Sequence, residues 1–508
     1  MRICGEGEVK FFLKRPFNKS RYAALSKGLD VSELKLSQVL RENRAWRFDA
    51  QYFSKTALAV EATIKRGSWQ ELIALSDSID SFGAYALTNE FSYSSDGVPF
   101  LRCMNIRRGF IDFSDVLFIP PEANQLLSKS EVKPGMVLLT MSGTVGNTAV
   151  ALPTWDYPIN SNQDIAKITT KASISPYYLA AFFGSKYGRS QLERLPVGSV
   201  QQHVFLWMIE RLAISRLPAD LEKRISEMVA TAYDIEARSE TNADDAEEIL
   251  LEAIGLSKWT PTESSQWVRT SRDVFKAGRL DAEHFKPKFA ELMSFLSNKP
   301  GSRKLGDILS LNQRGKQPIY VEEGLPVVNS KHVIYGRVRV DAENRYALPA
   351  ENDVLIENGD VLMNGTGVGT IGRAAPFLHD GNALPDNHVT ILRPNAGSVD
   401  PVYLAVFINS LAGQLQVEQR LRGSSGQIEL YPNDINAFTV WIAPPAVQKK
   451  VRQAVEAGFS LKKRAHQLLF AAKRAIELAI EATPAEATAY VEHVIGEGSG
   501  KRNSRLSA

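Results

Sequence analysis

The sequence is a tandem repeat: blocks of its first half recur in its second half, in the same order and at a nearly constant offset. In chain order, the matched pairs are "RFDAQYF" with "RLDAEHF", "DGVPFLRCMNIRRGFID" with "EGLPVVNSKHVIYGRVRV", "VKPGMVLLTMSGTVGNTAV" with "IENGDVLMNGTGVGTIGRAA", "NSNQDIAKI" with "LPDNHVTIL", "SPYYLAAFF" with "DPVYLAVFI", and "RLPVGSVQQHVFL" with "RLRGSSGQIEL". Self-similarity of this kind limits the architecture before any local pattern does, because both copies must fold alike. At 508 residues the chain has room for two such domains and for connecting helices.

Each copy mixes strand-like and helix-like segments. The runs "MVLLTM" and "DVLMNG" lie between Gly and Pro turns and are typical of strands. The stretches "SPYYLAAFFGSKYGRSQLERL" and "DPVYLAVFINSLAGQLQVEQRL" each predict a helix with a Ser or Asp cap and Pro in the first turn. Each copy is therefore expected to be an α/β or α+β globule.

Two long segments, 219–254 and 446–482, have the hydrophobic period of paired helices. Apolar or small residues alternate in steps of four and three, a period that indicates a coiled-coil seam. The predicted seam residues are Leu221, Ile225, Met228, Ala232, Ile235, Ser239, Asn242, Ala246, Ile249 and Ala253, followed in the second segment by Val447, Val451, Ala454, Gly458, Leu461, Ala465, Leu468, Ala472, Ala475 and Ala479. A helix of about 36 residues would be roughly 54 Å long.

The two long segments differ in the sign of their charge. The first carries eleven acidic residues against three basic ones, and the second carries eight basic residues against three acidic ones. Opposite signs favour pairing of the two helices with each other over pairing of either with its own kind. We therefore expect an intramolecular antiparallel pair. The alternative is that both segments are simply solvated faces, since a single surface ion pair contributes little.

The bulk composition narrows the class of protein. Net charge is only +3, so nucleic-acid binding would depend on local basic patches. The two cysteines, Cys4 and Cys103, make no disulfide framework and no Cys-rich metal site, and they suit a reducing cytoplasm. The first residues lack an apolar stretch of signal-peptide length, and no window approaches a membrane span. The sequence thus predicts a soluble cytoplasmic protein with no membrane partner.

The catalytic templates do not match. "GTGVGTIG" resembles a glycine-rich phosphate loop but lacks the Lys-Ser/Thr of a P-loop, and its partner copy is "SGTVGN", which favours a turn or bulge. The seven histidines show no metal-ligand spacing. "DAEHF" offers Asp281, Glu283 and His284 to a metal, but the matching "DAQYF" keeps only the Asp, so a structural role at the start of each copy is favoured. The chain is predicted not to be an enzyme.

Two alternatives stay open on the sequence alone. One is a nucleotide-dependent enzyme built around "GTGVGTIG". The other is a non-catalytic coiled-coil scaffold whose globular units bind proteins.

Two copies of one α/β unit, each followed by a long helix, resemble the specificity subunit of type I restriction-modification systems. The segments that carry the resemblance are "GVPFLRCMNI" with "GLPVVNSKHV", "VKPGMVLLTMSGTVG" with "IENGDVLMNGTGVGTIG", the two Gly-Ser-Gln loops, and the helix start "WIAPPAVQKKV". The resemblance covers about residues 47–482. The first helix start, "SRLPADLEKRI", departs from the family pattern because it lacks the second Pro and the Gln.

The resemblance implies two target-recognition domains separated by two long helices that form an antiparallel coiled coil, in a pseudo-two-fold symmetric arrangement. The expected boundaries are 1–46 for an N-terminal extension, 47–218 for the first recognition domain, 219–257 for the central spacer helix, 258–278 for a linker, 279–444 for the second recognition domain, 445–482 for the C-terminal spacer helix and 483–508 for a tail.

The resemblance also implies partners. Each recognition domain would bind one half of an asymmetric bipartite sequence in double-stranded DNA, and the coiled coil would set the spacing and dock two methyltransferase subunits. Restriction (translocase) subunits are further implied partners. S-adenosylmethionine, Mg²⁺ and ATP would belong to those partner subunits, and no cofactor is expected in this chain.

Two sets of polar residues are candidates for DNA contact, because Gln and Arg pair with base edges and Ser and Arg donate to phosphate. The loop set consists of Arg194, Ser199, Gln201 and Gln202 in the first copy and Arg420, Arg422, Ser424, Ser425 and Gln427 in the second. The basic cluster consists of Arg102, Asn105, Arg107 and Arg108, with Lys331, His332, Arg337 and Arg339 opposite them. The alternatives are a plain turn for the loops and exposed strand-edge charges for the cluster. Ser142, Thr144, Asn364 and Thr366 are expected to serve tight turns.

Overall fold

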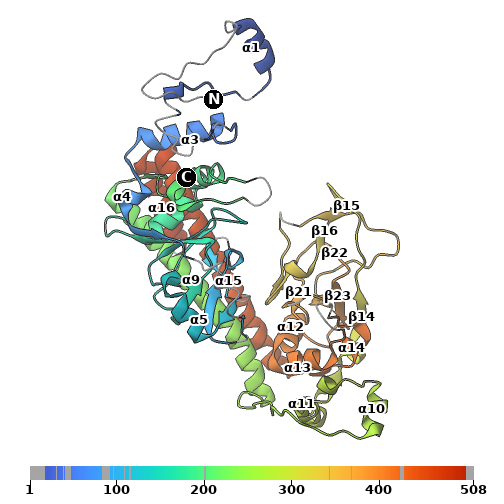
Figure 1. The fold of residues 1–508 in the computed structure, drawn as a ribbon. Helices are drawn as coiled ribbons and strands as arrows, with labels where there is room; N and C mark the ends of the chain where they lie inside the picture. Colours follow the sequence, from blue (N-terminus) through green and yellow to red (C-terminus); the bar gives the residue numbers. More distant parts are fainter. Residues whose placement is uncertain are drawn as a thin grey trace, which may run out of the picture. The chain divides into compact units, whose positions relative to one another are not determined.

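The computed structural model describes residues 18–29, 31–37, 39, 47, 49–82, 92–94, 96–107, 109–113, 116–198, 202–341, 344–367, 369–423 and 428–498. The chain divides into two compact parts. Unit 1 comprises Met1–Ala232 and Gln467–Ala508, and unit 2 comprises Tyr233–His466. Figure 1 labels several helices of both units and several strands of unit 2.

The described strands of unit 1 form two four-stranded sheets and two short pairs. The first sheet has the order β2 (Ser76–Asp80), β11 (Ile165–Thr170), β8 (Val137–Thr140) and β9 (Thr148–Val150). The second has the order β6 (Leu117–Ile119), β3 (Val98–Leu101), β10 (Ile159–Ser161) and β7 (Glu131–Val132). The pairs are β1 (Trp69–Glu71) with β12 (Ala213–Ser215) and β4 (Ile106–Arg107) with β5 (Phe110–Ile111).

The described part of unit 2 has the same set of sheets. The first sheet has the order β14 (Leu309–Arg314), β23 (Val389–Pro394), β20 (Val361–Asn364) and β21 (Ala374–Pro376). The second has the order β15 (Tyr320–Val321), β19 (Tyr346–Ala347), β16 (Leu325–Val328) and β22 (Leu384–Pro385). The pairs are β13 (Ser302–Lys304) with β24 (Thr439–Trp441) and β17 (Val333–Ile334) with β18 (Arg337–Val338).

The two units share one plan, as the repeat predicts. The first sheets match strand for strand, and their registers agree: Lys167 stands opposite Leu138 in unit 1, as Ile391 stands opposite Leu362 in unit 2. The parallel pair β3–β10 of unit 1 likewise corresponds to β16–β22 of unit 2. The mixed strand and helix content predicted from the sequence is therefore confirmed.

A helix packs on the first sheet of each unit. α6 (Pro176–Gly184) packs on β8 and β9, and α12 (Pro401–Asn409) packs on β20 and β21 (Figure 1). Both begin with the predicted Pro and cap: the side chain of Ser175 accepts the N–H of Tyr177, and that of Asp400 accepts the N–H of Val402. Their other faces are buried among aliphatic and aromatic residues, so each helix belongs to the core of its unit.

The prediction of one helix over each stretch is wrong at its midpoint. α6 ends at Gly184 and α7 (Lys186–Glu193) follows after Ser185, while α13 (Leu411–Arg420) follows α12 after Ser410. Three residues beyond each serine stands a glycine, Gly188 or Gly413, where a Cβ atom would overlap carbonyl oxygens of the preceding helix. The corner thus needs the Ser-x-x-Gly pattern that both copies contain.

The other described helices are mostly short. In unit 1 they are α1 (Lys19–Ser26), α3 (Lys55–Arg66), α4 (Leu72–Leu75), α5 (Pro121–Leu126), α8 (Leu206–Ile209) and α16 (Pro484–Gly498), with 3-10 turns η1 (Cys103–Asn105) and η2 (Ser128–Ser130). In unit 2 they are α10 (Ser271–Ala277), α11 (Pro287–Asn298) and α14 (Pro432–Asn436), with η3 (Ala282–Phe285), η4 (Leu305–Ile308) and η5 (Ser330–His332). None of the helices in the described part of the chain has the length and apolarity that crossing a membrane requires.

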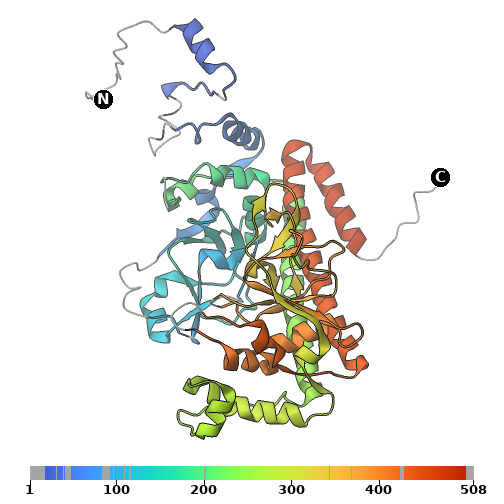
Figure 2. The same ribbon diagram turned by 90° about the vertical axis from the view of Figure 1, so that its right-hand side faces the viewer.

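Two long helices, α9 (Ala219–Ile254) and α15 (Pro445–Glu481), occupy the segments in which paired helices are predicted. Most of the predicted seam is buried: Leu221, Ile225, Met228, Ala232, Ser239 and Ala246 in α9, and Val451, Gly458, Ala465, Leu468, Ala472, Ala475 and Ala479 in α15. Ala253 is an exception, because it is exposed while Leu250 and Ile254 point into the core of unit 2. Figure 2 shows α16 folding back from the end of α15.

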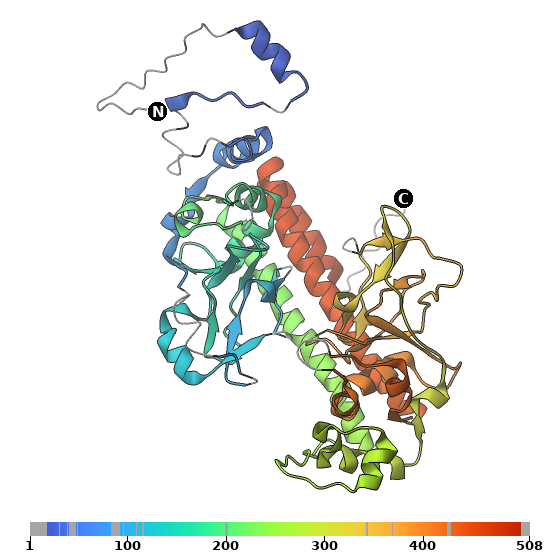
Figure 3. The ribbon, with the colours of Figure 1, turned by 45° about the vertical axis from the view of Figure 1, so that its right-hand side comes forward.

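Within unit 2 the two long helices run antiparallel. Glu236 of α9 pairs with Lys462 of α15, with 3.3 Å between Oε1 and Nζ. Further along α9, the carbonyl oxygen of Ser239 faces Gly458, where a Cβ atom would lie 3.1 Å from it. Residue numbers therefore rise on one helix as they fall on the other, and an acid of α9 meets a base of α15. Figure 3 shows the two helices side by side.

A glutamate of each long helix caps a helix of a globular unit. Glu477 of α15 accepts the N–H of Lys186, at the start of α7, at 2.8 Å. Glu247 of α9 accepts the N–H of Leu411, at the start of α13, at 3.0 Å. A carboxylate there satisfies an unpaired N–H and interacts favourably with the helix dipole. Equivalent helices of the two units are thus fixed to the long helices by the same contact.

A buried glutamine in each unit pairs with the backbone of a short strand. The Gln416 amide donates to Thr439 O at 3.0 Å and accepts the Thr439 N–H at 2.7 Å. The Gln191 amide makes the same two bonds with Ala213, at 2.9 and 3.0 Å. Each glutamine side chain thus hydrogen-bonds to the backbone of β24 or β12 in the way that a neighbouring strand would.

Gln416→Leu and Gln191→Leu are each expected to lower the free energy of unfolding by about 2–4 kcal/mol, because each leaves a buried N–H and a buried carbonyl unpaired. Urea denaturation monitored by circular dichroism measures the loss. Gln453→Leu is the matched control: Gln453 is exposed on α15, and its replacement should change stability by no more than about 0.5 kcal/mol. Losses equal to that of the control would contradict the assignment.

Candidate nucleic-acid interface

The Gly-Ser-Gln loop of unit 2 is closed by two backbone hydrogen bonds. The N–H of Arg422 donates to Glu429 O at 2.9 Å, and the N–H of Glu429 donates to Arg422 O at 2.8 Å. Ser424, Ser425 and Gln427 lie between these two residues but outside the described residues. Their contact with DNA stays a prediction.

The loop of unit 1 is closed in the same way. Val197 and His203 exchange both backbone hydrogen bonds, each at 3.0 Å. Ser199 and Gln201 fall outside the described residues, whereas Gln202 is described and is exposed to solvent. The two copies therefore close a loop with the same pair of backbone hydrogen bonds at the same place, as the repeat predicts.

In both units the loop lies against the glycine-rich turn. The N–H of Leu430 donates to Gly365 O at 2.9 Å, and the N–H of Val204 donates to Met141 O at 2.9 Å. An isolated bridge adds a second connection in each unit. The turn and the loop that the sequence analysis treated separately thus form one surface.

The geometry of "GTGVGTIG" contradicts the nucleotide-binding alternative. The segment joins β20 to β21, which are neighbouring antiparallel strands. A phosphate-binding fingerprint of this kind requires a turn that leads from a strand into a helix. Gly367, Gly369 and Gly372 have positive φ angles and serve the turn of a hairpin instead.

A third element, the 3-10 turn, contacts the glycine-rich turn. In unit 2 the side-chain amide of Asn364 donates to Ser330 O of η5 at 3.2 Å. In unit 1 the Cys103 thiol of η1 donates to Asp164 O at 3.3 Å, and the same oxygen accepts the N–H of Met141 at 2.7 Å. The 3-10 turn, the glycine-rich turn and the Gly-Ser-Gln loop together are named here the loop edge of each unit.

The Arg-x-Asp motif at the start of each copy holds the base of the loop. Arg47 donates to the carbonyl oxygens of Arg194 and Leu195 at 3.2 and 2.6 Å. Arg279 donates to Leu421 O at 3.0 Å and is paired with Asp281. The predicted structural role of these motifs is confirmed. Among the described residues, no group of three or more His, Cys, Asp or Glu side chains could hold a metal ion.

Arg194 and Arg420, predicted to contact DNA, are engaged inside the fold. Arg194 forms an ion pair with Glu61, and its side chain is 12% exposed. Arg420 donates to Gln416 O at 3.1 Å, and burial lowers its pKa to about 10. Both are reassigned to a structural role, because a DNA contact would require each to give up these partners.

Asn105 and His332 are also structural. They are 1% and 0% exposed, and each closes its 3-10 turn through the side chain. Asn105 Oδ1 accepts the N–H of Arg102 at 2.9 Å, and His332 Nδ1 accepts the N–H of Asn329 at 3.2 Å. No base or phosphate can reach these buried groups, so they too are withdrawn as DNA contacts.

The remaining residues of the basic cluster in unit 1 differ in how exposed they are to solvent. Arg102 is half-buried, and Arg108 lies outside the described residues. Arg107 is half-exposed and lies 3.4 Å from Asp112, while its Nε donates to Met104 O at 2.6 Å. Arg107 is thus the described arginine of this cluster with the most access to solvent.

In unit 2 the cluster divides in the same manner. Lys331 is exposed at the loop edge. Arg337 lies over the ring of Phe459 on α15, with 5.2 Å to the ring centre, and Arg339 pairs with Asp341 at 3.2 Å. Lys331 is the member placed to meet a ligand at this edge.

Arg422 is the exposed arginine of the second loop. Its side chain is 51% exposed and forms two hydrogen bonds with Asp434, at 2.7 and 3.1 Å. The hydrogen bonds to that carboxylate raise the pKa of the Arg422 guanidinium. Arg420 and Arg422, two positions apart, therefore face opposite environments.

An exposed aromatic residue that was not predicted stands just after the loop in each unit. Phe205 precedes α8 and is 45% exposed, and Tyr431 precedes α14 and is 42% exposed. Each stands two residues after the residue that closes its loop, His203 or Glu429. Extending the comparison of the copies past the loops would have found this pair.

No protein-family model matches the sequence, and no curated protein matches it. Among solved structures, the type I restriction-modification S subunit from M. genitalium is 12% identical, with 84% of this chain and 95% of that chain covered and a TM-score of 0.33. A chain from a structure concerned with complex assembly and conformational transition of the type I system is 14% identical, with 84% and 97% covered and a TM-score of 0.26. The HsdS subunit from Thermoanaerobacter tengcongensis is 14% identical, with 85% and 95% covered and a TM-score of 0.25. All three structures come from type I restriction-modification systems, the family that the sequence resembles.

Proposed function

We propose that this chain is the DNA-recognising specificity subunit of a type I restriction-modification complex and has no catalytic role of its own. The observation that carries the proposal is the loop edge, which one chain builds twice from the same backbone contacts but with different exposed side chains. Two similar surfaces suit two DNA half-sites, and different side chains suit different half-site sequences. The target is therefore bipartite and asymmetric.

The exposed residues of each loop edge supply the chemistry that DNA recognition uses. Arg107 and Gln202 are exposed in unit 1, and Lys331 and Arg422 in unit 2. Lysine and arginine bind phosphates, and arginine and glutamine pair with guanine and adenine edges in the major groove. Phe205 and Tyr431 add apolar area of the kind that contacts thymine methyl groups.

The long helices provide a spacer in this proposal. A helix of about 36 residues is roughly 54 Å long, which exceeds the rise of one DNA turn, ~34 Å. We propose that α9 and α15 form an antiparallel coiled coil that relates the two recognition domains by a pseudo-two-fold axis and sets the distance between half-sites. Their exposed charged faces would dock two methyltransferase subunits, to which restriction subunits are added. S-adenosylmethionine, Mg²⁺ and ATP would be bound by these partners in the cytoplasm.

The protein-binding scaffold remains the competing hypothesis. It shares the long helices but needs no cationic or amide side chains at the loop edges. Titration of the chain with DNA at low and high salt separates the two hypotheses, because DNA binding through phosphates weakens steeply as salt rises.

Coexpression with its neighbouring methyltransferase gene in a methylation-free host is expected to modify adenines in a two-part motif with an unspecified gap. Sequencing of the host genome by a method that detects modified adenines measures the motif. Replacing residues 90–210 with the corresponding segment of another specificity subunit should change one half of the motif only. The matched exchange in unit 2 should change the other half.

The absence of DNA binding by the assembled complex at low salt would contradict the proposed function. A complex that binds DNA but leaves adenines unmodified would contradict the docking of methyltransferase subunits. Altered recognition of both halves after a single exchange would contradict the assignment of one half-site to each unit.

Arg422→Ala is expected to weaken DNA binding about five- to tenfold at 0.1 M salt and to reduce the salt slope by about one unit, because one cation is lost from the interface. Fluorescence anisotropy over a salt series measures both. Arg420→Ala is the matched variant and should instead destabilise the protein by about 1.5–3 kcal/mol, because its hydrogen-bond partners are buried. Equal effects of the two variants on the salt slope would contradict the assignment.

A further inference from the structure

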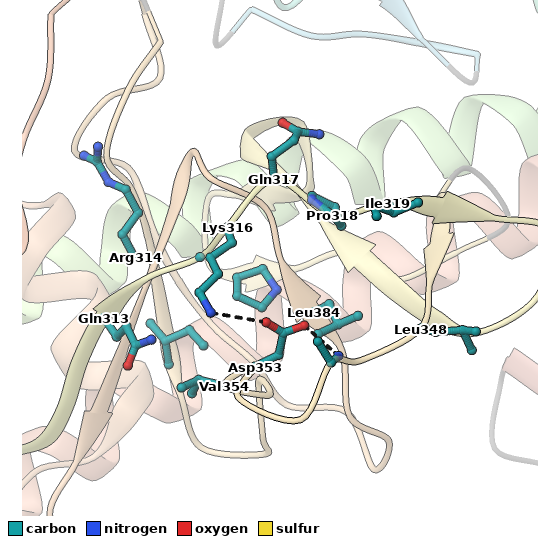
Figure 4. Close-up of a pocket in the computed structure, with 14 residues that line it drawn as sticks. Gln313, Arg314, Lys316, Gln317, Pro318, Ile319, Leu348, Asp353, Val354 and Leu384 are labelled. Atoms are coloured by element: carbon teal, nitrogen blue, oxygen red, sulfur yellow. Dashed lines mark hydrogen bonds and ion pairs between the residues drawn. The ribbon is translucent and has the colours of Figure 1, made fainter.

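The segment after β14 in unit 2 concentrates DNA-binding side chains that the sequence analysis did not select. Gln313, Arg314, Lys316 and Gln317 stand within five residues, around Gly315. The segment borders a cavity of about 290 Å³, whose floor includes Leu384, Pro385 and Ile391. Figure 4 shows these side chains around the cavity.

Arg314 ties this segment to the loop edge. Its Nη2 donates to Gly365 O at 3.1 Å, in the glycine-rich turn, and to Leu430 O at 2.5 Å, just after the Gly-Ser-Gln loop. Its Nη1 lies 3.6 Å from Glu429, and the guanidinium lies 5.3 Å from the ring centre of Tyr431. Arg314 is therefore a positioning residue, because its two terminal nitrogens already face protein groups.

The path of the segment beyond Arg314 is fixed by close packing. A Cβ atom at Gly315 would overlap the backbone carbonyl of Asp386, so the chain can follow this course only with glycine here. Lys316 is two residues beyond Arg314, and two residues of chain span at most roughly 7 Å. The backbone of Lys316 therefore lies close to the residue that binds the loop edge, and its ammonium group lies beside Asp353.

Lys316 is exposed and weakly held. Its side chain is 65% exposed, and Nζ lies 3.6 Å from Asp353 Oδ1, beyond the usual length of a hydrogen bond. Asp353 itself is fixed, because its Oδ2 accepts the N–H of Ala350 at 2.9 Å. Figure 4 shows Lys316 reaching along the cavity toward Asp353. An exposed pair of this kind exchanges readily for another anion.

The matching segment of unit 1 has no lysine of its own, but the exposed Lys129 lies beside it, with Nζ 5.7 Å from the ring centre of Phe82. By strand register, Asp80 opposite Lys167 in unit 1 corresponds to Gln313 opposite Ile391 in unit 2. Lys167 is 1% exposed and donates to Ser161 Oγ at 3.2 Å, and burial lowers its pKa to about 8. The residues after Asp80, "SFGAYA", contain no Lys, Arg or Gln. The two units therefore differ in what holds the exposed lysine here: Lys129 lies over an aromatic ring in unit 1, and Lys316 lies beside a carboxylate in unit 2.

We infer that residues 313–317 of unit 2 form a second DNA-contact element, in which Lys316 leaves Asp353 and binds a phosphate of the DNA backbone beside the bases that the loop contacts. The inference rests on the proposed function. Asp353 competes with the phosphate for the same ammonium group, so it limits affinity until DNA arrives. Gln317, exposed next to Lys316, adds a donor and an acceptor to this contact.

The test uses the full chain assembled with its methyltransferase subunits and a duplex that carries the motif found by genome sequencing. Dissociation constants are measured from about 0.05 to 0.2 M salt, the range over which phosphate contacts weaken most visibly. Lys316→Gln should weaken binding about five- to tenfold at 0.1 M salt and lower the salt slope by about one unit. Asp353→Asn should tighten binding, because it removes the competing carboxylate.

Lys258→Gln is the control, since Lys258 is exposed in unit 2 but lies outside the loop edge and this segment. Its affinity and slope should match those of the unmodified protein, and thermal melts should show that all three variants fold. If Lys316→Gln behaves like the control while the unmodified complex binds its motif, the inference is overturned and the proposed function stands. If the affinity of Asp353→Asn for DNA is unchanged, the proposed competition between Asp353 and the phosphate for Lys316 is overturned. If the unmodified complex binds no DNA, both the proposed function and the inference fail.

Discussion

The backbone hydrogen bond between the segment after each Gly-Ser-Gln loop and the glycine-rich turn is the contact on which the candidate interface depends. Leu430 with Gly365, and Val204 with Met141, join two loops that are far apart in sequence into one surface. Because backbone groups form this bond, it does not depend on which side chains the two loops carry, although Arg314 reinforces it in unit 2. The two units can therefore share the backbone geometry of the loop edge while they expose different side chains on it.

The elements that surround this contact were partly predictable from sequence. The tandem repeat, the caps at Ser175 and Asp400 and most of the helical seam follow from periodicity and residue type. The division into α6 and α7 at Ser185, and into α12 and α13 at Ser410, was not predicted, because the apolar run before each serine suggests one continuous helix. Local sequence patterns thus predict where the helices lie, whereas the bend between two consecutive helices depends on how they pack.

The site residues were less predictable, because burial depends on which way a short irregular segment turns. Arg420 and Arg422 belong to one pattern, yet Arg420 is held inside the fold and Arg422 is half-exposed. Asn105 and His332 look like polar ligands in sequence but close 3-10 turns from inside. The type of a residue determines which groups its side chain can bind. Whether that side chain is already bound to a group within the protein depends on the fold.

The difference between the units then has a physical meaning. Lys167 and Ile391 occupy one register position, and the buried lysine of unit 1 donates to Ser161 and interacts with the charge of Asp80. Unit 2 has an apolar residue there, and its lysine, Lys316, lies at the surface three residues beyond Gln313, the strand partner of Ile391. A charge that is buried must be satisfied within the fold, whereas an exposed one is available to a ligand at little cost. Divergence of the duplicated unit at this place therefore changes both the course of the chain, which needs Gly315 in unit 2 where unit 1 has Phe82, and the groups that hold its lysines.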